Sequence, residues 1–441
     1  MRKKINQKFY SNYLSTAKNL LTVVIVILLK ISCKKEVKDS ITITILSPSI
    51  GYSASFGDTI HVRAFINATS VLQSVSVEIT DVAANSLSDP QIVVPGVNEF
   101  LFETDYVPFN TNATSGNFIL SVSAKTQHGF NHQGVSIFLE SMPILTKAIY
   151  VATASDTLSF SIWEIDSSGP VFRKTVPGDF NNLAVSSHYN SLSTSGKISG
   201  GIHYYALPDF IETFTLPPAN PPPLPTFMTH YFDSERNYLG FYNGAIRSYD
   251  QNGFQQFDSG DDVFFRPTLL LRNSDYVIAE MTNTASHQNN IAAYFYPSGA
   301  RRQIIGISFD IVAMFPKSND EIFLFGMQND HLRIYTYSIA GNNVNLVKDA
   351  GVLQLNAAVQ VAGNDFLLGC DEGLFHYTYA NGSNVNVASF ACNFLEINSI
   401  DNVVYCASGN RLHTLAIASF ASAGTIAMND SILNVRVLYT K

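Results

Sequence analysis

Charged residues and cysteine are both scarce in this 441-residue sequence. Charged side chains make up 14% of it, against about 25% in typical soluble proteins. With a formal net charge of −8 and no basic stripe, a nucleic-acid partner is not expected. Beyond Cys33 the cysteines are Cys370, Cys392 and Cys406. These allow at most one disulfide, so the fold has to be held by its hydrophobic core.

The motifs of common catalytic sites are also missing. The sequence has no nucleophile elbow, no phosphate-binding Walker loop, no HExxH zinc motif and no CxxC pair. Glycoside hydrolysis would need two carboxylates about 5–10 Å apart. The candidates for such a pair lie in predicted turns: Asp262, Asp330, Asp371 and Glu372. A hydrolase or lyase acting on polysaccharide therefore stays open as an alternative function.

The first 33 residues have the layout of a secretory signal. Basic residues open the chain, an apolar core runs from Leu20 to Leu29, and Ser32 precedes Cys33. A membrane-spanning helix needs about 20 apolar residues, and this core is much shorter. The sequence therefore predicts export rather than a transmembrane anchor.

The end of this segment resembles the lipobox of bacterial lipoprotein precursors. Ser32 and Cys33 match the lipobox, whereas Lys30 stands where the family prefers Leu, with Leu29 one residue earlier. The charged stretch 34–40 is similar to the tether of Bacteroidota-type surface lipoproteins. The resemblance implies lipidation of Cys33 by palmitate-like acyl chains, which would anchor the protein stably. It also implies an outer-membrane lipoprotein of the cell envelope, on the surface or periplasmic face.

Residues 41–142 predict a β-sandwich of immunoglobulin type. Short β-rich runs alternate with turn residues, and six or seven strands in about 100 residues suit that fold. The runs are Ile41 to Leu46, Thr59 to Phe65, Ser74 to Ile79, Phe100 to Tyr106, Phe118 to Ala124 and Val135 to Leu139.

Residues 143–441 contain a repeat of about 40 residues. Each repeat has a polar residue that opens an apolar strand, then a turn, then an alternating strand. The clearest apolar strands begin near Asp275, Asp320, Asp365 and Asp401. A period of this length with four strands is typical of a β-propeller blade. Strands that are covered on both faces lose their alternation, which explains the continuous apolar runs.

Counting these units predicts seven blades. Six lie near 182–216, 225–258, 266–307, 309–350, 353–391 and 394–428. Three strands in front of them, together with a last strand from Leu433 to Tyr439, make up the seventh. The C-terminal strand would then close the ring and remove exposed sheet edges.

The front of this region resembles one class of seven-bladed propeller. Tyr150-Val151-Ala152-Thr153, followed by the strand Leu158 to Asp166, is similar to the YVTN repeat. The resemblance covers one blade, and it implies the same all-β propeller fold that the repeat predicts.

Binding residues are expected where the loops between second and third strands, and between successive blades, meet at one end of the propeller. Three connections there are long: Met281 to Asn290, Pro217 to Pro225, and Asp258 to Arg266. The proline run predicts an extended polyproline II segment. The candidate ligand-binding residues are Asp261, Asp262, Arg266, His287, Asn290, Asp330, His331, Asp371, Glu372 and Arg411. Asp258, Asp261 and Asp262 could instead form a calcium site or a solvated turn.

The sequence thus predicts an extracytoplasmic lipoprotein whose propeller binds or scaffolds a protein partner or a glycan. That role needs no cofactor and no metal. A structural subunit of an envelope complex, recognisable by an apolar patch, is a third alternative.

Overall fold

The computed structural model describes residues 38–81, 85–87, 89–110, 113–154, 156 and 158–440. The predicted signal with Cys33 lies outside them. The chain forms two compact units, Met1–Met142 and Pro143–Lys441. Regular secondary structure in the described residues consists of strands alone, which confirms the predicted all-β class. Among these residues no helix could cross a membrane.

The first unit contains two sheets that share one core. The smaller has the order β1 (Ile41–Ser47), β3 (Ile60–Ala68) and β6 (Glu99–Tyr106). The larger has the order β2 (Tyr52–Ser55), β8 (Phe130–Glu140), β7 (Gly116–Lys125), β4 (Ser74–Thr80) and β5 (Gln91–Val93). β2 runs parallel to β8, and the other neighbours in both sheets are antiparallel.

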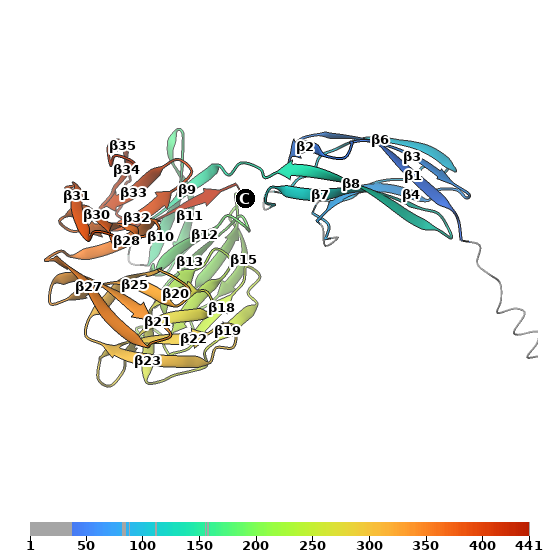
Figure 1. Cartoon of the computed structure of the whole chain (residues 1–441). Helices are drawn as coiled ribbons and strands as arrows, with labels where there is room; N and C mark the ends of the chain where they lie inside the picture. The colour runs from blue at the N-terminus through green and yellow to red at the C-terminus, as the bar shows by residue number, and fades with distance from the viewer. Residues whose placement is uncertain are drawn as a thin grey trace, which may run out of the picture. The chain divides into compact units, whose positions relative to one another are not determined.

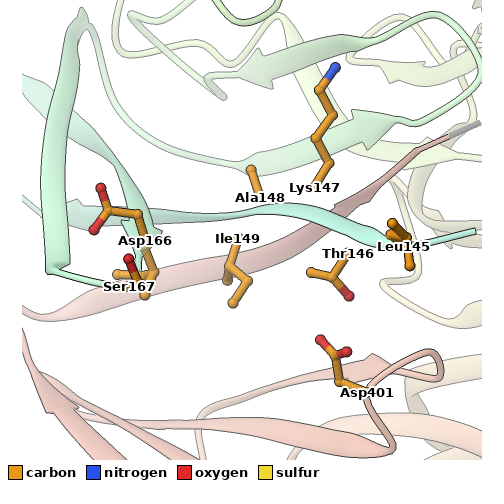
Figure 2. A pocket seen from close by; sticks show the side chains of 9 residues that line it. Leu145, Thr146, Lys147, Ala148, Ile149, Asp166, Ser167 and Asp401 are labelled. Atoms are coloured by element: carbon orange, nitrogen blue, oxygen red, sulfur yellow. The ribbon is translucent and has the colours of Figure 1, made fainter.

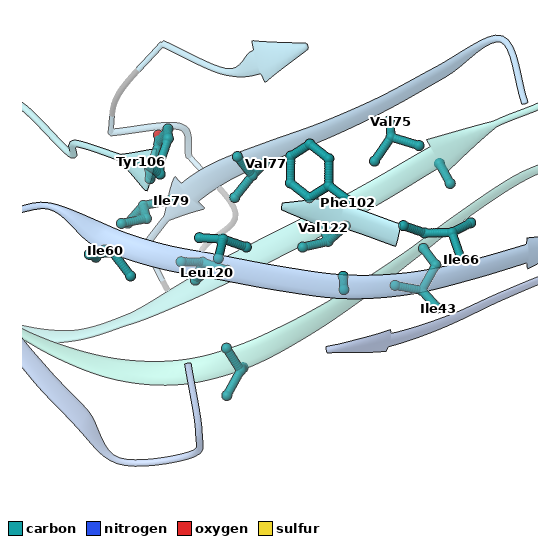
Figure 3. Close-up of a cluster of buried hydrophobic side chains, with 14 of the residues drawn as sticks. Ile43, Ile60, Ile66, Val75, Val77, Ile79, Phe102, Tyr106, Leu120 and Val122 are labelled. Atoms are coloured by element: carbon teal, nitrogen blue, oxygen red, sulfur yellow. The ribbon is translucent and has the colours of Figure 1, made fainter. Parts of the chain in front are cut away.

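Alternation along the strands explains this core. In β3, Ile60, Val62, Ala64 and Ile66 are fully buried, while the alternate residues His61, Arg63 and Phe65 face solvent. The inward side chains of β3 meet those of the larger sheet, such as Val77 and Leu120 (Figure 3). Burying each such side chain contributes about 1.5–3 kcal/mol.

The second unit contains seven four-stranded sheets among its described residues. One of them has the order β11 (Gly169–Pro177), β10 (Ser159–Asp166), β9 (Thr146–Ala154) and β36 (Ile432–Tyr439). The others follow the chain in order: β12 (Asn182–Ser186), β13 (Ser191–Ser195), β14 (Ile202–Ala206), β15 (Ile211–Leu216); β16 (Phe227–Phe232), β17 (Asn237–Phe241), β18 (Ile246–Tyr249), β19 (Gln255–Asp258); β20 (Phe265–Asn273), β21 (Tyr276–Asn283), β22 (Asn289–Phe295), β23 (Arg301–Ile307); β24 (Asp310–Pro316), β25 (Glu321–Gln328), β26 (His331–Ser338), β27 (Asn343–Gly351); β28 (Leu355–Ala362), β29 (Asp365–Cys370), β30 (Gly373–Thr378), β31 (Ser383–Ala388); β32 (Phe394–Asn398), β33 (Val403–Ser408), β34 (Arg411–Ala416), β35 (Ser422–Ala427).

The inner strands of these sheets form a closed circuit. β12 contacts β16, and the contacts continue through β20, β24, β28 and β32 to β36, which contacts β12. The sheets follow one another around this circuit in chain order (Figure 1). β36 comes from the end of the chain and pairs with β9, near the start of the unit. The two ends of the unit are therefore joined within one sheet.

The apolar runs of the repeat are strands covered on both faces. In β21, Val277 packs in a core cluster with Tyr238 of the preceding sheet. The next residue, Ile278, packs in a different cluster with Leu324 of the following sheet. Both faces of the sheet are thus buried, which is why this strand does not alternate with polar residues.

Candidate functional site

The ten predicted ligand-binding residues lie at the same edge of their sheets, called the rim here. Adjacent strands are antiparallel, so second-to-third connections leave the same edge as connections between sheets. Asp261 and Asp262 lie between β19 and β20, and Arg266 lies at the start of β20. His287 lies in the β21–β22 connection, and Asn290 lies at the start of β22. Asp330 and His331 lie at β25–β26, Asp371 and Glu372 at β29–β30, and Arg411 at the start of β34.

The long proline connection at the rim differs from its prediction. It is not extended throughout, because the amide of Leu224 donates to the carbonyl of Pro221 at 3.1 Å and closes a turn. The side chain of Thr226 accepts from the amides of Ala219 and Asn220, each at 2.9 Å. These bonds fold the run back on itself.

The carboxylates of the β19–β20 connection are held by arginines. Arg247 donates from Nε to Asp258 at 3.0 Å and from Nη2 to Asp261 at 3.2 Å. Arg301 Nη1 lies 2.7 Å from Asp262 Oδ2. The calcium alternative required these carboxylates to face a cation together. They face guanidinium groups instead, and the described residues hold no group of three metal-binding side chains.

These ion pairs fix a loop whose tip is apolar. Val263 and Phe264 are 63% and 67% exposed. Their carbonyls are nevertheless engaged: Thr284 donates its amide to Phe264 O at 2.9 Å and its hydroxyl to Val263 O at 3.3 Å. Arg266 Nη1 also donates to Val263 O at 3.3 Å, and its guanidinium lies 4.2 Å from the centre of the Tyr242 ring. The backbone of the tip is thus held by hydrogen bonds, while its two side chains are exposed.

Gly244 makes this arrangement possible. Its φ is +88°, and a Cβ placed there would lie 1.9 Å from the carbonyl oxygen of Asp262. Only glycine therefore allows the β17–β18 turn to approach the β19–β20 connection this closely. The amide of Asp262 donates to Asn243 O at 3.1 Å across that contact.

Two other acidic residues at the rim, Asp371 and Glu372, each accept a hydrogen bond from a neighbour. Asp371 Oδ1 accepts from Asn356 Nδ2 at 2.8 Å. Glu372 accepts from the amide of Gln354 at 3.1 Å. Each of these two carboxylates is thus hydrogen-bonded to a residue of the connection that precedes its own sheet or of its first strand.

The remaining predicted residues include one polar cluster. His331 Nδ1 lies 3.0 Å from Asp349 Oδ1, and Arg333 Nε lies 3.1 Å from the other oxygen. The hydrogen bond from His331 is the main reason that the pKa of Asp349 falls to about 2. Asp330 lies in the turn before His331 with a φ of +62°. His287, Asp330 and Arg411 are exposed.

One buried constellation was missed from the sequence. His230 lies between Ser195 Oγ, 3.0 Å from its Nδ1, and Asn237 Oδ1, 2.5 Å from its Nε2. This is the order of nucleophile, base and orienting group in a hydrolytic triad. Ser195 is fully buried, however, so a substrate cannot reach its hydroxyl. Burial also lowers the pKa of His230 to about 4. The cluster joins residues of two sheets, and no local sequence motif predicts it.

A polar belt links the inner strands on both sides of β36. Arg436 Nε donates to Leu183 O of β12 at 3.0 Å, and Nη1 donates to Glu396 of β32 at 2.9 Å. Asn434 Nδ2 donates to Asn182 Oδ1 at 2.8 Å. Burial raises the pKa of Glu396, and the charge of Arg436 opposes that rise. The C-terminal strand is thereby fastened to both neighbouring sheets.

Comparisons with known proteins place the fold. No protein-family model matches the chain, and no curated protein matches it. A crystal structure of a Lactobacillus plantarum protein is 11% identical, with a TM-score of 0.51, over 67% of this chain and 100% of that one.

Two further solved structures were matched. A quinonprotein alcohol dehydrogenase-like protein from Bacteroides thetaiotaomicron is 8% identical over 90% of this chain and 99% of that one, with a TM-score of 0.47. Apo AztD from Citrobacter koseri is 10% identical over 66% and 98%, with a TM-score of 0.45. At such identities a likeness concerns the fold alone. With the circuit of four-stranded sheets, the Lactobacillus plantarum match defines a β-propeller protein, as the repeat predicted.

Proposed function

We propose that the propeller is a non-catalytic binding module and that its contact surface for a protein partner is the rim. The observation that carries this proposal is the β19–β20 tip, where Val263 and Phe264 are exposed on a backbone fixed by ion pairs and hydrogen bonds. A rigid apolar anchor loses little conformational freedom on binding, and aromatic anchors dominate interface energies. The polar groups beneath the tip are used in holding it, so the tip itself offers apolar contact rather than the hydrogen bonds that a glycan needs.

The proposal includes the finer architecture. Each four-stranded sheet of the second unit would be one blade, giving seven blades closed by β36. The closed circuit of inner strands supports this count. The two sheets of the first unit, packed over a single core, would be an Ig-like sandwich. The corresponding domain boundaries are 41–142 and 143–441, preceded by a signal and a tether.

A photo-crosslinking experiment tests the rim. A photoreactive phenylalanine analogue at position 264 is expected to crosslink one defined protein in cells that make the full chain. The matched control is the same analogue at Leu346, which is also exposed but lies on the outermost strand β27. Val263→Ser should weaken binding of the crosslinked partner more than about tenfold. Equal crosslinking at both positions would contradict a rim interface.

A parallel thermal-shift measurement tests whether the partner is a glycan instead of a protein. A glycan that binds the folded protein raises its melting temperature at concentrations above its dissociation constant. A thermal shift by one polysaccharide that disappears in Phe264→Ser would assign the rim to a glycan instead. Cleavage of that polysaccharide by the protein, by hydrolysis or by a lyase reaction, would support the alternative that the protein is an enzyme.

The anchor is the second part of the proposal. The lipobox-like segment supports an exported, outer-membrane lipoprotein that carries lipid on Cys33. Metabolic labelling with palmitate should mark the protein, and Cys33→Ala should abolish the label. Cys370→Ala is the control, because Cys370 is a buried free thiol that should carry no lipid. A label that persists in Cys33→Ala would rule out this anchor.

A further inference from the structure

Three arginines contact the β19–β20 connection, and they differ in how their charge is used. Arg247 and Arg301 each form ion pairs with aspartates at the end of β19 or in the connection. Arg266 forms no ion pair among the residues that the structure describes, and its contacts there are with backbone carbonyls and an aromatic ring. Its positive charge is therefore not neutralised by a neighbouring carboxylate.

The guanidinium of Arg266 is held from one side. Nη1 donates to the carbonyls of Val263 and Phe265, at 3.3 and 3.2 Å. The ring of Tyr242 lies against the guanidinium, with 4.2 Å between Cζ and the ring centre. A guanidinium has five N–H donors, of which Nη1 carries two. The other three, on Nε and Nη2, have no hydrogen-bond partner within the described part of the chain.

The edge that remains suits a carboxylate. Nε and Nη2 of an arginine lie side by side and can donate two parallel hydrogen bonds to the two oxygens of one carboxylate. Tyr242 and the two carbonyls already fix the group, so little side-chain freedom is lost when a carboxylate binds. The same bond to Val263 places this edge next to the exposed side chains of Val263 and Phe264. A charged contact and an apolar contact thus adjoin at the tip.

We propose that Arg266 determines the specificity of the rim by binding an acidic side chain, aspartate or glutamate, of a protein partner whose neighbouring apolar residues pack on Val263 and Phe264. This inference rests on the proposed rim interface and names the partner segment that fits it. An acid within a segment suits the tip better than a chain end, because apolar contact with two side chains needs partner residues on both sides of the acid. The net charge of −8 gives no general attraction for an acidic partner, so this contact has to supply the selectivity.

Selection from a displayed peptide library tests the assignment. Random peptides fused to a phage coat protein by their C-termini have no free terminal carboxylate, so any acid they carry is a side chain. The full chain is expected to select peptides in which an acidic residue stands next to an aromatic or aliphatic one. The same selection with Arg266→Gln should lose the acidic preference. Selected peptides without an acid, or binding only by peptides displayed with a free C-terminus, would overturn the proposal.

A double-mutant cycle shows whether the acid meets Arg266 itself. For one selected peptide, replacing its acid by the matching amide and introducing Arg266→Gln should each weaken binding about tenfold. Both changes together should weaken it no further than either alone, because the pair is already lost. Arg266→Lys should recover little affinity, since an ammonium cannot donate the paired bonds. Additive losses would mean that Arg266 only shapes the loop and would refute the contact.

Two controls remove a positive charge from the opposite edge of the sheets. Arg236, in the β16–β17 connection, also lies over a tyrosine ring, that of Tyr296 at 5.4 Å. Lys147 lines a cleft of about 490 Å³ at the same edge (Figure 2), and its Nζ donates to Asn190 Oδ1 at 2.8 Å. Arg236→Gln and Lys147→Gln should leave the peptide affinity unchanged. A loss in either control equal to that in Arg266→Gln would reduce the effect to net charge and contradict the assignment.

Val263→Ser separates this proposal from the rim interface on which it rests. Peptides that are weakened by Val263→Ser but keep their affinity in Arg266→Gln would leave the rim interface standing and overturn the role of Arg266. Peptides that ignore Val263→Ser bind elsewhere and would contradict the rim itself. A library that yields no binder at all would contradict both.

Discussion

Deleting residues 430–441 is expected to abolish the cooperative unfolding transition of the second unit. The deletion removes β36, whose side chains Ile432, Val435, Val437 and Leu438 are buried between two sheets. Their burial contributes about 6–12 kcal/mol at about 1.5–3 kcal/mol each. That is comparable with the whole stability of a typical protein, about 5–15 kcal/mol. Thermal unfolding followed by calorimetry would show a broad, early transition in the truncated chain.

A shorter deletion provides the control. Removing only residues 440 and 441 leaves β36 in place and loses the hydrogen bonds that Thr440 makes with Leu145. This variant should melt close to the full chain. If the longer deletion melted as sharply and as late as the full chain, β36 would not close the propeller.

Substitution of Arg436 tests how much the contacts of β36 contribute to the free energy of unfolding. Arg436→Met keeps the apolar stem but leaves Glu396 without its charge partner. Leaving a buried charge unpaired costs about 3–5 kcal/mol, and partial exposure of both side chains puts the expected loss near the lower end. Adding Glu396→Gln to Arg436→Met should recover part of the loss, because the unpaired charge is then gone. Urea unfolding of both variants checks this.

The propeller could be predicted from the repeat, because the repeat is a pattern of residues that are close together in the sequence. A polar residue such as Asp275 or Asp365 opens each apolar strand, and the strand is followed by a turn and an alternating strand. These local signals also placed the second-to-third connections, and hence the predicted residues, at one edge. The strands β2 and β5 of the first unit were missed because they are short and lack a buried alternating face.

The contacts that decide the chemistry of the site were not predictable in this way. The ion pair between Asp262 and Arg301 joins residues 39 apart in sequence. Asn434 meets Asn182 across 252 residues. The ion pairs of the β19–β20 acids could not be predicted for this reason, since their arginine partners come from other strands.

Two buried titratable groups should give the stability opposite dependences on pH. Burial lowers the pKa of His230 from 6.5 to about 4, so the unfolded chain takes up a proton that the folded protein excludes. Stability due to His230 is therefore present above pH 6.5 and is lost as the pH falls through 4. Burial raises the pKa of Glu280 from 4.5 to about 7, against hydrogen bonds from Thr268 and the amide of Ile311. Stability due to Glu280 is present below pH 4.5 and is lost as the pH rises through 7.

Each shift corresponds to about 3 kcal/mol, and in the unaltered protein the two effects oppose each other between their pKa values. Separate variants should reveal them. His230→Gln, which keeps a hydrogen-bonding side chain near Asn237, leaves the Glu280 effect, so the free energy of unfolding should fall by about 3 kcal/mol as the pH rises from 4.5 to 7. Glu280→Gln leaves the His230 effect, so stability should fall by a similar amount as the pH drops from 6.5 to 4. Urea unfolding across this range should therefore give slopes of opposite sign for the two variants. Parallel curves would contradict the opposite pKa shifts that burial gives His230 and Glu280.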